Sequence, residues 1–225
     1  MVVVFISGKP LAMPWVKENA DAIVVQWYGG EMQGRSMADI LTGHVNPSGR
    51  LNVSFPRSTG NTPCYYNHFI TDREEPFDQP GSHDDPKGHY IFDKPDPLWN
   101  FGYGLSYTQF KYQRCTIRDS VLSATDTLRV DVEVENIGQR DGKEVIQLYV
   151  RDKFSSVATP IQQLKGFKKE FIPAGKRVKI TLKVPVSELG LYNERMKYII
   201  EPGEFDIQIG SASDQILFHK TIIIK

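Results

Sequence analysis

The sequence predicts two fold classes in succession: a partial parallel α/β sandwich domain, followed by an antiparallel β-sandwich. Three observations lead to this expectation. Short apolar runs alternate with helix-like runs over residues 1–56. A stretch rich in Pro, Gly, Asp, His and aromatic residues follows over 57–100. From residue 109 onward, short strands separated by turn signals follow one another closely, which is typical of an all-β domain.

The composition is that of an ordinary globular chain. It has 225 residues, of which 40% are hydrophobic and 24% charged, so a sizeable core can be buried. Lys+Arg and Asp+Glu number 27 each, and this balance favours neither nucleic acid nor an anionic membrane as a partner. The first apolar run, "VVVFI", is shorter than a signal-peptide core or a membrane-spanning helix, so we expect neither in this chain.

The chain opens on a strand of the parallel sheet. Val2–Ile6 is apolar throughout, as in strands that are buried on both faces. A short helix is expected in "PWVKENA", with Pro14 in its first turn, and a second buried strand in "DAIVVQWY". Strands of this kind usually lie inside a sheet. We therefore expect the chain to be the tail of a longer protein, begun within a domain, and the Val2–Ile6 edge to favour self-association.

A glycine pair separates the second strand from the next helix. The helix is expected from Glu31 to Leu41, with Gly43 as its stop, and "RLNVSFP" is expected to be a third strand. Glycines before a helix can hold a phosphate, but this turn lacks the Lys-Ser/Thr of a P-loop and the three spaced glycines of a dinucleotide turn. Glu31 would repel an anion there, so the stretch is interpreted as a strand-to-helix crossover.

Residues 57–100 show neither helical nor strand periodicity. Their aromatic content indicates an ordered loop that lies over another surface. Histidines and aspartates in this loop raise the alternative of a metal site, but they lack regular ligand spacing, and we expect no metal and no cofactor. Whether Cys64 and Cys115 pair stays open. The residues that raise the metal alternative are His68, His83, His89, Asp72, Asp84 and Asp85.

The pattern of residues 109–225 predicts an antiparallel β-sandwich. In "TLRVDVEVEN", apolar residues alternate strictly with charged ones, which predicts a strand with one buried and one solvated face. Further short strands follow, separated by turns such as "PAG" and "PGE". Without a Cys…Trp…Cys core, the fibronectin III-like branch of such sandwiches fits better than the immunoglobulin branch. The predicted domains are 1–108 and 109–225.

Four motifs occur in order along the chain: "SGKPLAMPWV", "AIVVQWYGGEMQGRSMADILTGHVNPSGRLNVSFP", "PLWNFGYGLSYTQF" and "ATPIQQLKGFKKEFIPAGK…LYNERMKYIIEPGEFDIQIG". Together they resemble the C-terminal part of glycoside hydrolase family 3, in particular β-glucosidase and β-xylosidase-type enzymes of bacteria.

The resemblance implies a retaining β-glycosidase that acts on terminal β-linked sugars in carbohydrate metabolism. Such enzymes carry a (β/α)₈ barrel, then an α/β sandwich domain, then a fibronectin III-like domain. The nucleophile Asp and the acid/base Glu lie in segments that no residue of this chain matches. We therefore expect no catalytic residue here and a structural role for this chain alone. For the whole protein, the resemblance implies a periplasmic or extracellular location and a β-glucoside or β-xyloside as its substrate.

One loop offers residues that could lie near the substrate: Tyr65, Tyr66, Asn67, His68 and Arg73. Aromatic and planar polar side chains stack on sugar rings and hydrogen-bond to their hydroxyls. Packing between domains explains the same residue types, and both interpretations stay open.

A function of another class is a stand-alone carbohydrate- or protein-binding module built on residues 109–225. It requires aromatic side chains exposed on the sandwich. The strand pattern predicts instead that most of them are buried. The aromatic residues concerned are Tyr149, Phe154, Phe167, Phe171, Tyr192, Tyr198, Phe205 and Phe218.

Overall fold

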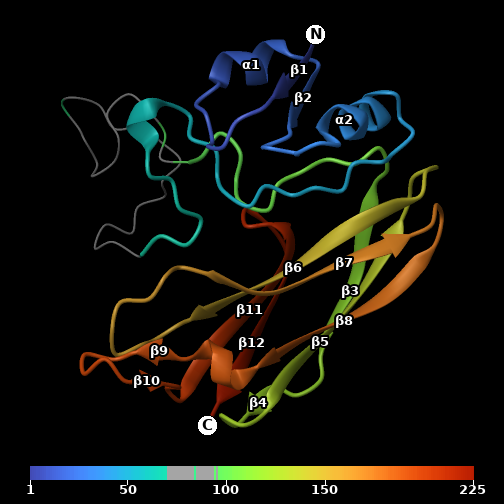
Figure 1. The fold of residues 1–225 in the computed structure, drawn as a ribbon. Coiled ribbons are helices and arrows are strands. Elements are labelled where there is room, and N and C mark those ends of the chain that lie inside the picture. The colour runs from blue at the N-terminus through green and yellow to red at the C-terminus, as the bar shows by residue number, and fades with distance from the viewer. Residues whose placement is uncertain (70–83, 85–93, 95) are drawn as a thin grey trace.

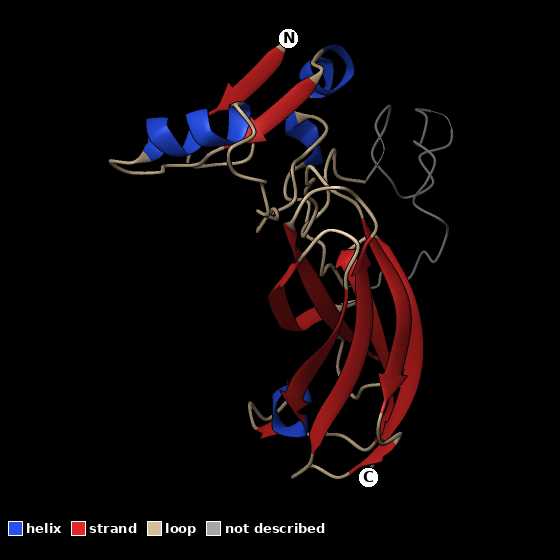
Figure 2. Cartoon of the chain, turned by 90° about the vertical axis from the view of Figure 1, so that its right-hand side faces the viewer, coloured by secondary structure: helices blue, strands red, loops and turns tan. Residues whose placement is uncertain are grey.

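A small α/β part lies above an elongated β-sandwich (Figure 1). The computed structural model describes residues 1–69, 84, 94 and 96–225. The N terminus lies at the outer side of the α/β part, and the C terminus at the opposite end of the sandwich (Figure 1). In the perpendicular view, the α/β part sits against one end of the sandwich (Figure 2). No helix in the described residues has the length and apolarity needed to span a bilayer.

The described residues of the α/β part form two parallel strands and two helices, as expected for a βαβ unit. Val2 pairs with Ala22, and the register continues to the pair Phe5 and Val25. The first helix has Pro14 at its N-terminal end, as the sequence predicts. The elements are β1 (Val2–Phe5), α1 (Pro14–Asn19), β2 (Ala22–Val25), α2 (Gln33–Leu41) and a one-turn 3₁₀ helix η1 (Thr59–Asn61).

The predicted start of the second helix is wrong by two residues. Helix α2 begins at Gln33, and Glu31 lies in an exposed turn before it. Gly30 has a φ of +66°, outside the helical range, and this conformation delays the start of the helix. The predicted stop is confirmed, since Gly43 follows the helix with a φ of +77°.

The predicted third strand is also wrong. Within "RLNVSFP", only Phe55 makes a β-bridge, and its partner is Trp99 in an antiparallel arrangement. The amide of Leu51 donates to the carbonyl of Tyr103 at 2.8 Å, and that of Phe55 to the carbonyl of Trp99 at 2.8 Å. The segment therefore satisfies its backbone against residues 98–103 instead of extending the β1–β2 pair.

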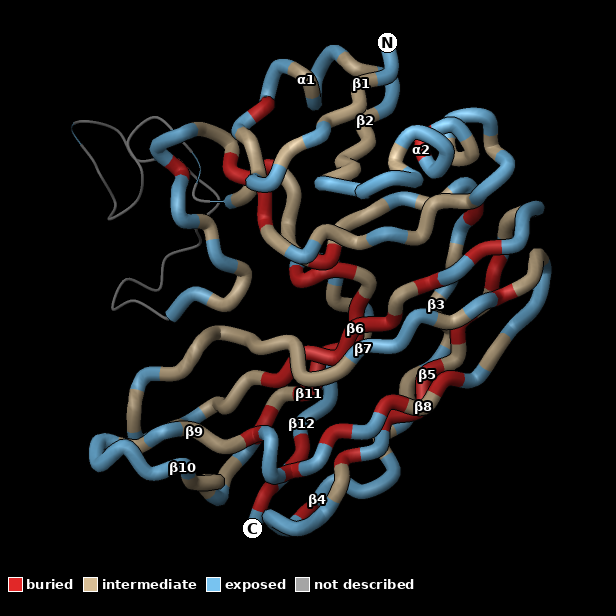
Figure 3. Tube along the Cα trace, in the orientation of Figure 1, coloured by how far each residue is buried: buried red, intermediate tan, exposed pale blue. Residues whose placement is uncertain are grey.

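This irregular pairing creates the core of the α/β part. Phe55 is 1% exposed and packs with Met13 and Leu98. Its ring lies 5.8 Å from that of Trp27 and 6.0 Å from that of Trp99. The cluster is small, and most of residues 1–50 are intermediate or exposed (Figure 3).

The sandwich consists of a five-stranded and a three-stranded sheet. Their strand orders are β4-β12-β11-β6-β7 and β3-β5-β8. Neighbouring strands are antiparallel except β12 and β4. The strands are β3 (Phe110–Ile117), β4 (Val121–Leu122), β5 (Thr127–Asn136), β6 (Gly142–Asp152), β7 (Gln163–Ile172), β8 (Arg177–Pro185), β9 (Leu191–Tyr192), β10 (Tyr198–Ile199), β11 (Gly203–Ala212) and β12 (Gln215–Ile224), with a 3₁₀ helix η2 (Val186–Leu189) after β8.

The sandwich holds the main core of the described chain. Leu128, Val130, Val132 and Val134 on β5 are at most 1% exposed, which confirms the buried face predicted from their alternation. Burying one such side chain contributes about 1.5–3 kcal/mol to the free energy of unfolding. The solvated face is less regular than predicted, because Asp131 is buried beneath Thr181 and Lys179, which bind its carboxylate at 2.6 and 3.0 Å.

The expectation that most aromatic residues of the sandwich are buried is wrong. Only Tyr149 and Phe205 are buried. Strand β7 carries two of the exposed rings, because it is the edge strand and its outer face has no covering layer. The hairpin β9–β10 carries two more outside both main sheets. The exposed rings belong to Phe154, Phe167, Phe171, Tyr192 and Tyr198.

Candidate functional site

The loop that carries the predicted substrate-side residues runs against the sandwich. The amide of Ile161 donates to the carbonyl of His68 at 2.9 Å. Next to it, Phe69 and Pro160 form an isolated antiparallel bridge. The loop after β6 therefore holds residues 66–69 in place.

Tyr66 is used for packing between the two parts. Its ring stacks on Phe101 with centroids 4.1 Å apart and meets Tyr149 edge-on at 5.9 Å. Its hydroxyl accepts a hydrogen bond from the backbone amide of Leu164 at 3.2 Å. The ring and the hydroxyl of Tyr66 are thus both in contact with other residues of this chain. This arrangement matches the interdomain-packing interpretation of Tyr66.

The other predicted residues differ in their placement. Tyr65 is 66% exposed and Asn67 is half-buried. His68 is exposed, and its Nδ1 lies 3.1 Å from the carbonyl of Phe69. Arg73 lies outside the described residues. The structure brings Tyr65 to His68 together as neighbours in one loop, and their role toward a substrate stays a prediction.

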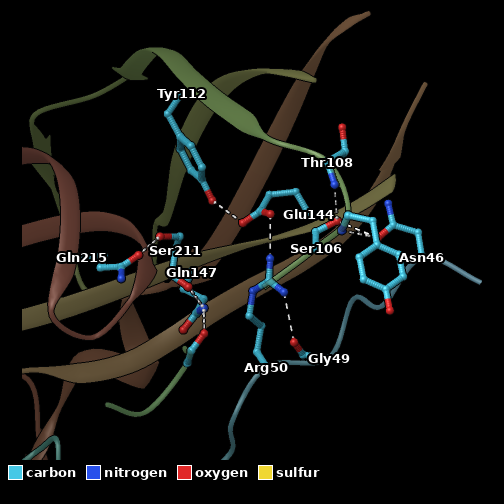
Figure 4. Close-up of polar contacts among 12 residues, drawn as sticks. Asn46, Gly49, Arg50, Ser106, Thr108, Tyr112, Glu144, Gln147, Ser211 and Gln215 are labelled. Carbon is cyan, nitrogen blue, oxygen red and sulfur yellow. Dashed lines mark hydrogen bonds and ion pairs between the residues drawn. The ribbon is translucent and has the colours of Figure 1, made fainter. Parts of the chain in front are cut away.

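A buried ion pair joins the two parts (Figure 4). Nη2 of Arg50 lies 2.7 Å from Oε2 of Glu144, and the two side chains are 9% and 3% exposed. The other carboxylate oxygen accepts a hydrogen bond from the hydroxyl of Tyr112 at 3.0 Å. Arg50 comes from the α/β part, Glu144 from β6 and Tyr112 from β3, so the contact joins both sheets of the sandwich to the α/β part.

Burial dominates the electrostatics of this contact. It raises the pKa of the Glu144 carboxyl, while Arg50 and the Tyr112 hydroxyl act in the opposite direction. Burial, followed by the charge of Glu144, raises the pKa of Tyr112 well above its ordinary value. Both carboxylate oxygens of Glu144 are occupied, and the residue is only 2% exposed. Glu144 is therefore a structural carboxylate, because no substrate can reach it.

A second contact covers the outer face of the five-stranded sheet. The side-chain amide of Gln147 donates to the carbonyls of Gly102 and Ser211, and its oxygen accepts from the hydroxyl of Tyr149. Figure 4 shows Gln147 beside Ser211. Gly102 has a φ of +84°, and a Cβ there would lie 2.2 Å from Oε1 of Gln147. Only glycine fits at this position, for both backbone conformation and space.

A third contact is built around Asn46, in the turn after α2. Its side-chain amide donates to the carbonyl of Asp141 at 2.8 Å, while its oxygen accepts from Ser106 and from the amide of Tyr107, each at 2.8 Å. Together with the Arg50 and Gln147 contacts, it fixes the α/β part on the sandwich at three separate points. We refer to these three contacts as the interdomain junction.

Sequence reasoning missed this junction, although one signal was present. In "GKEVIQLYV", Glu144 shares its face with Ile146, Leu148 and Val150, all of which are buried. A carboxylate on the apolar face of a strand requires a partner, because burying an unpaired charge is very costly. The partner, Arg50, is 94 residues away in sequence and could not be identified from the pattern.

Among the described residues, no three His, Cys, Asp or Glu side chains gather in a way that could hold a metal ion. His83 and His89, which raised this alternative, lie outside the described residues. Cys64 and Cys115 are both free thiols. Burial is the main cause that raises the pKa of each.

Two family descriptions match the chain. Residues 1–107 match the glycosyl hydrolase family 3 C-terminal domain, and residues 144–213 match the fibronectin type III-like domain. The chain is 38% identical over 216 residues to a periplasmic β-glucosidase of Salmonella typhimurium and 38% identical over 213 residues to a β-xylosidase of Formosa agariphila. It is covered to 96% and 95% in these alignments and spans 28% of each relative's length.

Solved structures give the same result. The crystal structure of the β-glucosidase of Listeria innocua in complex with glucose matches 99% of this chain with a TM-score of 0.90 and 32% identity. The match covers 30% of that protein. A β-glucosidase of Erythrobacter marinus matches the whole chain with a TM-score of 0.88 and 35% identity. The chain therefore belongs to glycoside hydrolase family 3, and it corresponds to that family's C-terminal domain followed by its fibronectin type III-like domain.

Proposed function

We propose that this chain forms the C-terminal part of a retaining β-glycosidase that hydrolyses terminal β-linked glucosides or xylosides. In this proposal the chain contributes structure, and both catalytic carboxylates come from the part of the enzyme that this chain does not match. The observation that carries the proposal is the match to β-glucosidases through both domains in one arrangement, at a TM-score of 0.90 over 99% of the chain.

The interdomain junction supports a structural role. Its buried ion pair and the Tyr112 hydrogen bond use both oxygens of Glu144, and its other contacts use the side-chain amides of Gln147 and Asn46. These groups are engaged with one another and are not directed at a ligand. The sandwich thus holds the α/β part in a fixed orientation, which a catalytic site built partly on the α/β part requires.

Two further features belong to the proposal. The relative from Salmonella typhimurium is a periplasmic β-glucosidase, which supports a periplasmic or extracellular location for the whole protein. The partner proposed for the whole protein is its β-glucoside or β-xyloside substrate. The equal numbers of acidic and basic residues give no reason to add nucleic acid or a membrane.

A chimera tests the proposal. The region of the Salmonella typhimurium β-glucosidase that this chain matches is replaced by this chain, and the hydrolysis of an aryl β-glucoside and an aryl β-xyloside is measured. We expect the chimera to hydrolyse at least one of them, because the carboxylates of the relative are kept and their support is replaced by an equivalent fold. A soluble, folded chimera without turnover, beside an active parent, would contradict the proposal.

A matched control separates structural from catalytic carboxylates. Glu31 is an exposed carboxylate in the glycine-containing turn before α2, and it is the acidic residue here that most resembles a catalytic one by sequence. The Glu31→Gln chimera is expected to keep the turnover of the unsubstituted chimera. A hundredfold loss would assign chemistry to this turn and refute the structural role.

A further inference from the structure

Strand β7 is an edge of the five-stranded sheet, and part of this edge is uncovered. Among the described residues, β7 pairs with β6 on one side and with no strand on the other (Figure 1). The first residues of β7 are occupied, because the amide of Leu164 donates to the hydroxyl of Tyr66 at 3.2 Å. An edge strand presents unpaired backbone groups to any further strand that approaches it. From Gly166 onward, β7 is therefore open to pairing.

Two features of the chain limit this open segment. The pairing with β6 shifts register at Lys165, which is an extra residue on β7 between two consecutive residues of β6. Such a bulge bends a strand and interrupts its flat edge. At the other end, Pro173 follows the strand and has no amide to donate. We refer to residues 166–172 as the free edge, and its middle residue is Lys169.

The side chains of the free edge are arranged symmetrically about Lys169. Phe167 and Phe171 lie on the outer face of the sheet and are 65% and 50% exposed. Lys168 and Glu170 lie on the other face, where Nζ and Oε2 are 3.0 Å apart and both side chains reach solvent. An aromatic ring thus stands two residues to each side of the centre, and opposite charges stand one residue to each side.

This arrangement is complementary to a second copy of the same strand in antiparallel orientation. When Lys169 faces Lys169 of the copy, Phe167 faces Phe171 and Lys168 faces Glu170. Aromatic pairs and opposite-charge pairs directly across two antiparallel strands both stabilise the pairing. Because the contact is symmetric, each of these favourable pairs occurs twice, whereas the like-charge pair of Lys169 occurs once. This register also uses the whole length of the free edge.

The charges favour this register over its neighbours. Lysines on an edge strand commonly prevent pairing with other strands. A shift by two residues in one direction would place Lys168 opposite Lys168 of the copy, and a shift in the other direction would place Glu170 opposite Glu170. Either shift would also place each phenylalanine of one pair opposite Lys169. The same lysines that oppose other pairings therefore permit the centred one.

We propose that two copies of this chain associate through the free edge of β7, antiparallel and with Lys169 on the two-fold axis. The dimer continues the five-stranded sheet of one copy into the five-stranded sheet of the other. The proposed dimer does not depend on the proposed enzymatic function, because it concerns assembly alone. It is also distinct from association through β1, which Val3→Lys suppresses by placing a charge on that edge.

Cysteine cross-linking tests the register, because only the residue on the two-fold axis faces its own copy. Residues directly opposite in an antiparallel pair have Cα atoms about 4.5–5.5 Å apart, which is within the range of a disulfide. Lys169→Cys is oxidised in the Val3→Lys background, and mass spectrometry identifies the linked peptides. We expect a disulfide between two copies at position 169.

Two matched controls measure unspecific cross-linking. Lys168→Cys lies on the same strand but faces Glu170 in this register, and Lys183→Cys replaces an exposed lysine on β8. Both should cross-link at least about tenfold more slowly than Lys169→Cys, because their Cα atoms do not come within disulfide distance of their own copies. Equal rates for the three variants, or no disulfide at position 169, would overturn the proposal.

Charge variants in the Val3→Lys background test the pairing by sedimentation equilibrium, and far-UV circular dichroism verifies that each variant folds. Glu170→Lys turns two opposite-charge pairs into two like-charge pairs and should weaken the dimer about tenfold. Exchanging the two charges in Lys168→Glu/Glu170→Lys should restore it. Lys169→Thr removes the like-charge pair and should strengthen the dimer about threefold. A Val3→Lys chain that stays monomeric at high micromolar concentration, or a dimer that Glu170→Lys does not weaken, would refute the β7 contact.

Discussion

Removing one partner of the buried ion pair tests whether the junction couples the two parts. Arg50→Met keeps most of the length and apolar bulk of the side chain but leaves the carboxylate of Glu144 buried without a countercharge. Both side chains of the pair are at most 9% exposed, so water cannot replace the missing charge. Breaking a buried pair in this way costs about 3–5 kcal/mol, and we expect the free energy of unfolding to fall by that amount at pH 7.

The chain contains two independent probes for this experiment. All three tryptophans, Trp15, Trp27 and Trp99, lie in the α/β part, whereas most strand residues lie in the sandwich. Tryptophan fluorescence and far-UV circular dichroism are followed through a urea titration. In the unsubstituted chain the two transitions should coincide. In Arg50→Met, the fluorescence transition should move to lower urea, because the α/β part loses one of its three contacts with the sandwich.

The pH dependence of the stability penalty of Arg50→Met tests whether the carboxylate of Glu144 causes it. Burial already raises the pKa of Glu144, and loss of the Arg50 charge raises it further. A carboxyl whose pKa is higher in the folded chain than in the unfolded chain binds more protons when the chain is folded. Its unfavourable contribution to the free energy of unfolding therefore becomes smaller as the pH falls toward the pKa of the unfolded chain. The penalty of Arg50→Met should therefore decrease between pH 7 and pH 5.

Three results bear on this reasoning. A penalty below about 1 kcal/mol would show that water or another group compensates the charge, since that is the scale of an exposed pair. A penalty that does not change with pH would exclude Glu144 as its source. The double variant Arg50→Met/Glu144→Leu serves as the control, because it removes both charges. It should recover most of the lost stability, as apolar replacements of buried pairs commonly do.

The remaining predictions concern the chain by itself. It should not hydrolyse an aryl β-glucoside or β-xyloside, and turnover above buffer that survives repurification would contradict this. Residues 109–225 should melt cooperatively when expressed alone and residues 1–108 should not, because the sandwich holds the main core; separate thermal melts test this. The whole chain should self-associate through β1, which pairs only with β2 among the described residues. Light scattering on a dilution series should show larger species for the unsubstituted chain than for Val3→Lys.

The sequence predicts the sandwich strands well because their signal is local. The alternation in "TLRVDVEVEN" identifies β5 with its observed bounds, Thr127–Asn136, and "KRVKITLKVP" contains β8. Each residue of such a strand either enters the core or faces solvent, so a period of two is sufficient. The same pattern could not show which outer faces stay uncovered. Whether an outer face is covered depends on the position of the strand in its sheet. For this reason the rings of Phe167 and Phe171 were expected to be buried although they are exposed.

The α/β part was harder to predict because its pairing is not local. "RLNVSFP" has the composition of a strand, but composition does not identify the partner. Its backbone bonds to residues 98–103, across the loop 57–100, instead of joining the neighbouring β1–β2 pair. Tyr66 could be named from its residue type as a residue that contacts either a sugar or the other domain. Its packing role depends on Phe101 and Tyr149, which only the folded chain brings to it.

The junction shows why a polar contact is used where an apolar one would contribute more stability. Apolar surfaces are non-directional, so two parts joined only by such surfaces can shift against each other with little cost. The carboxylate of Glu144 binds Arg50 through one oxygen and Tyr112 through the other, which fixes its position on both sheets. The glycine at 102 fixes a second point, because Gln147 fills the space that a side chain would need. Orientation is thus determined by directional contacts at the junction, whereas stability is supplied by the core of the sandwich, and a part that must hold its position against another needs both.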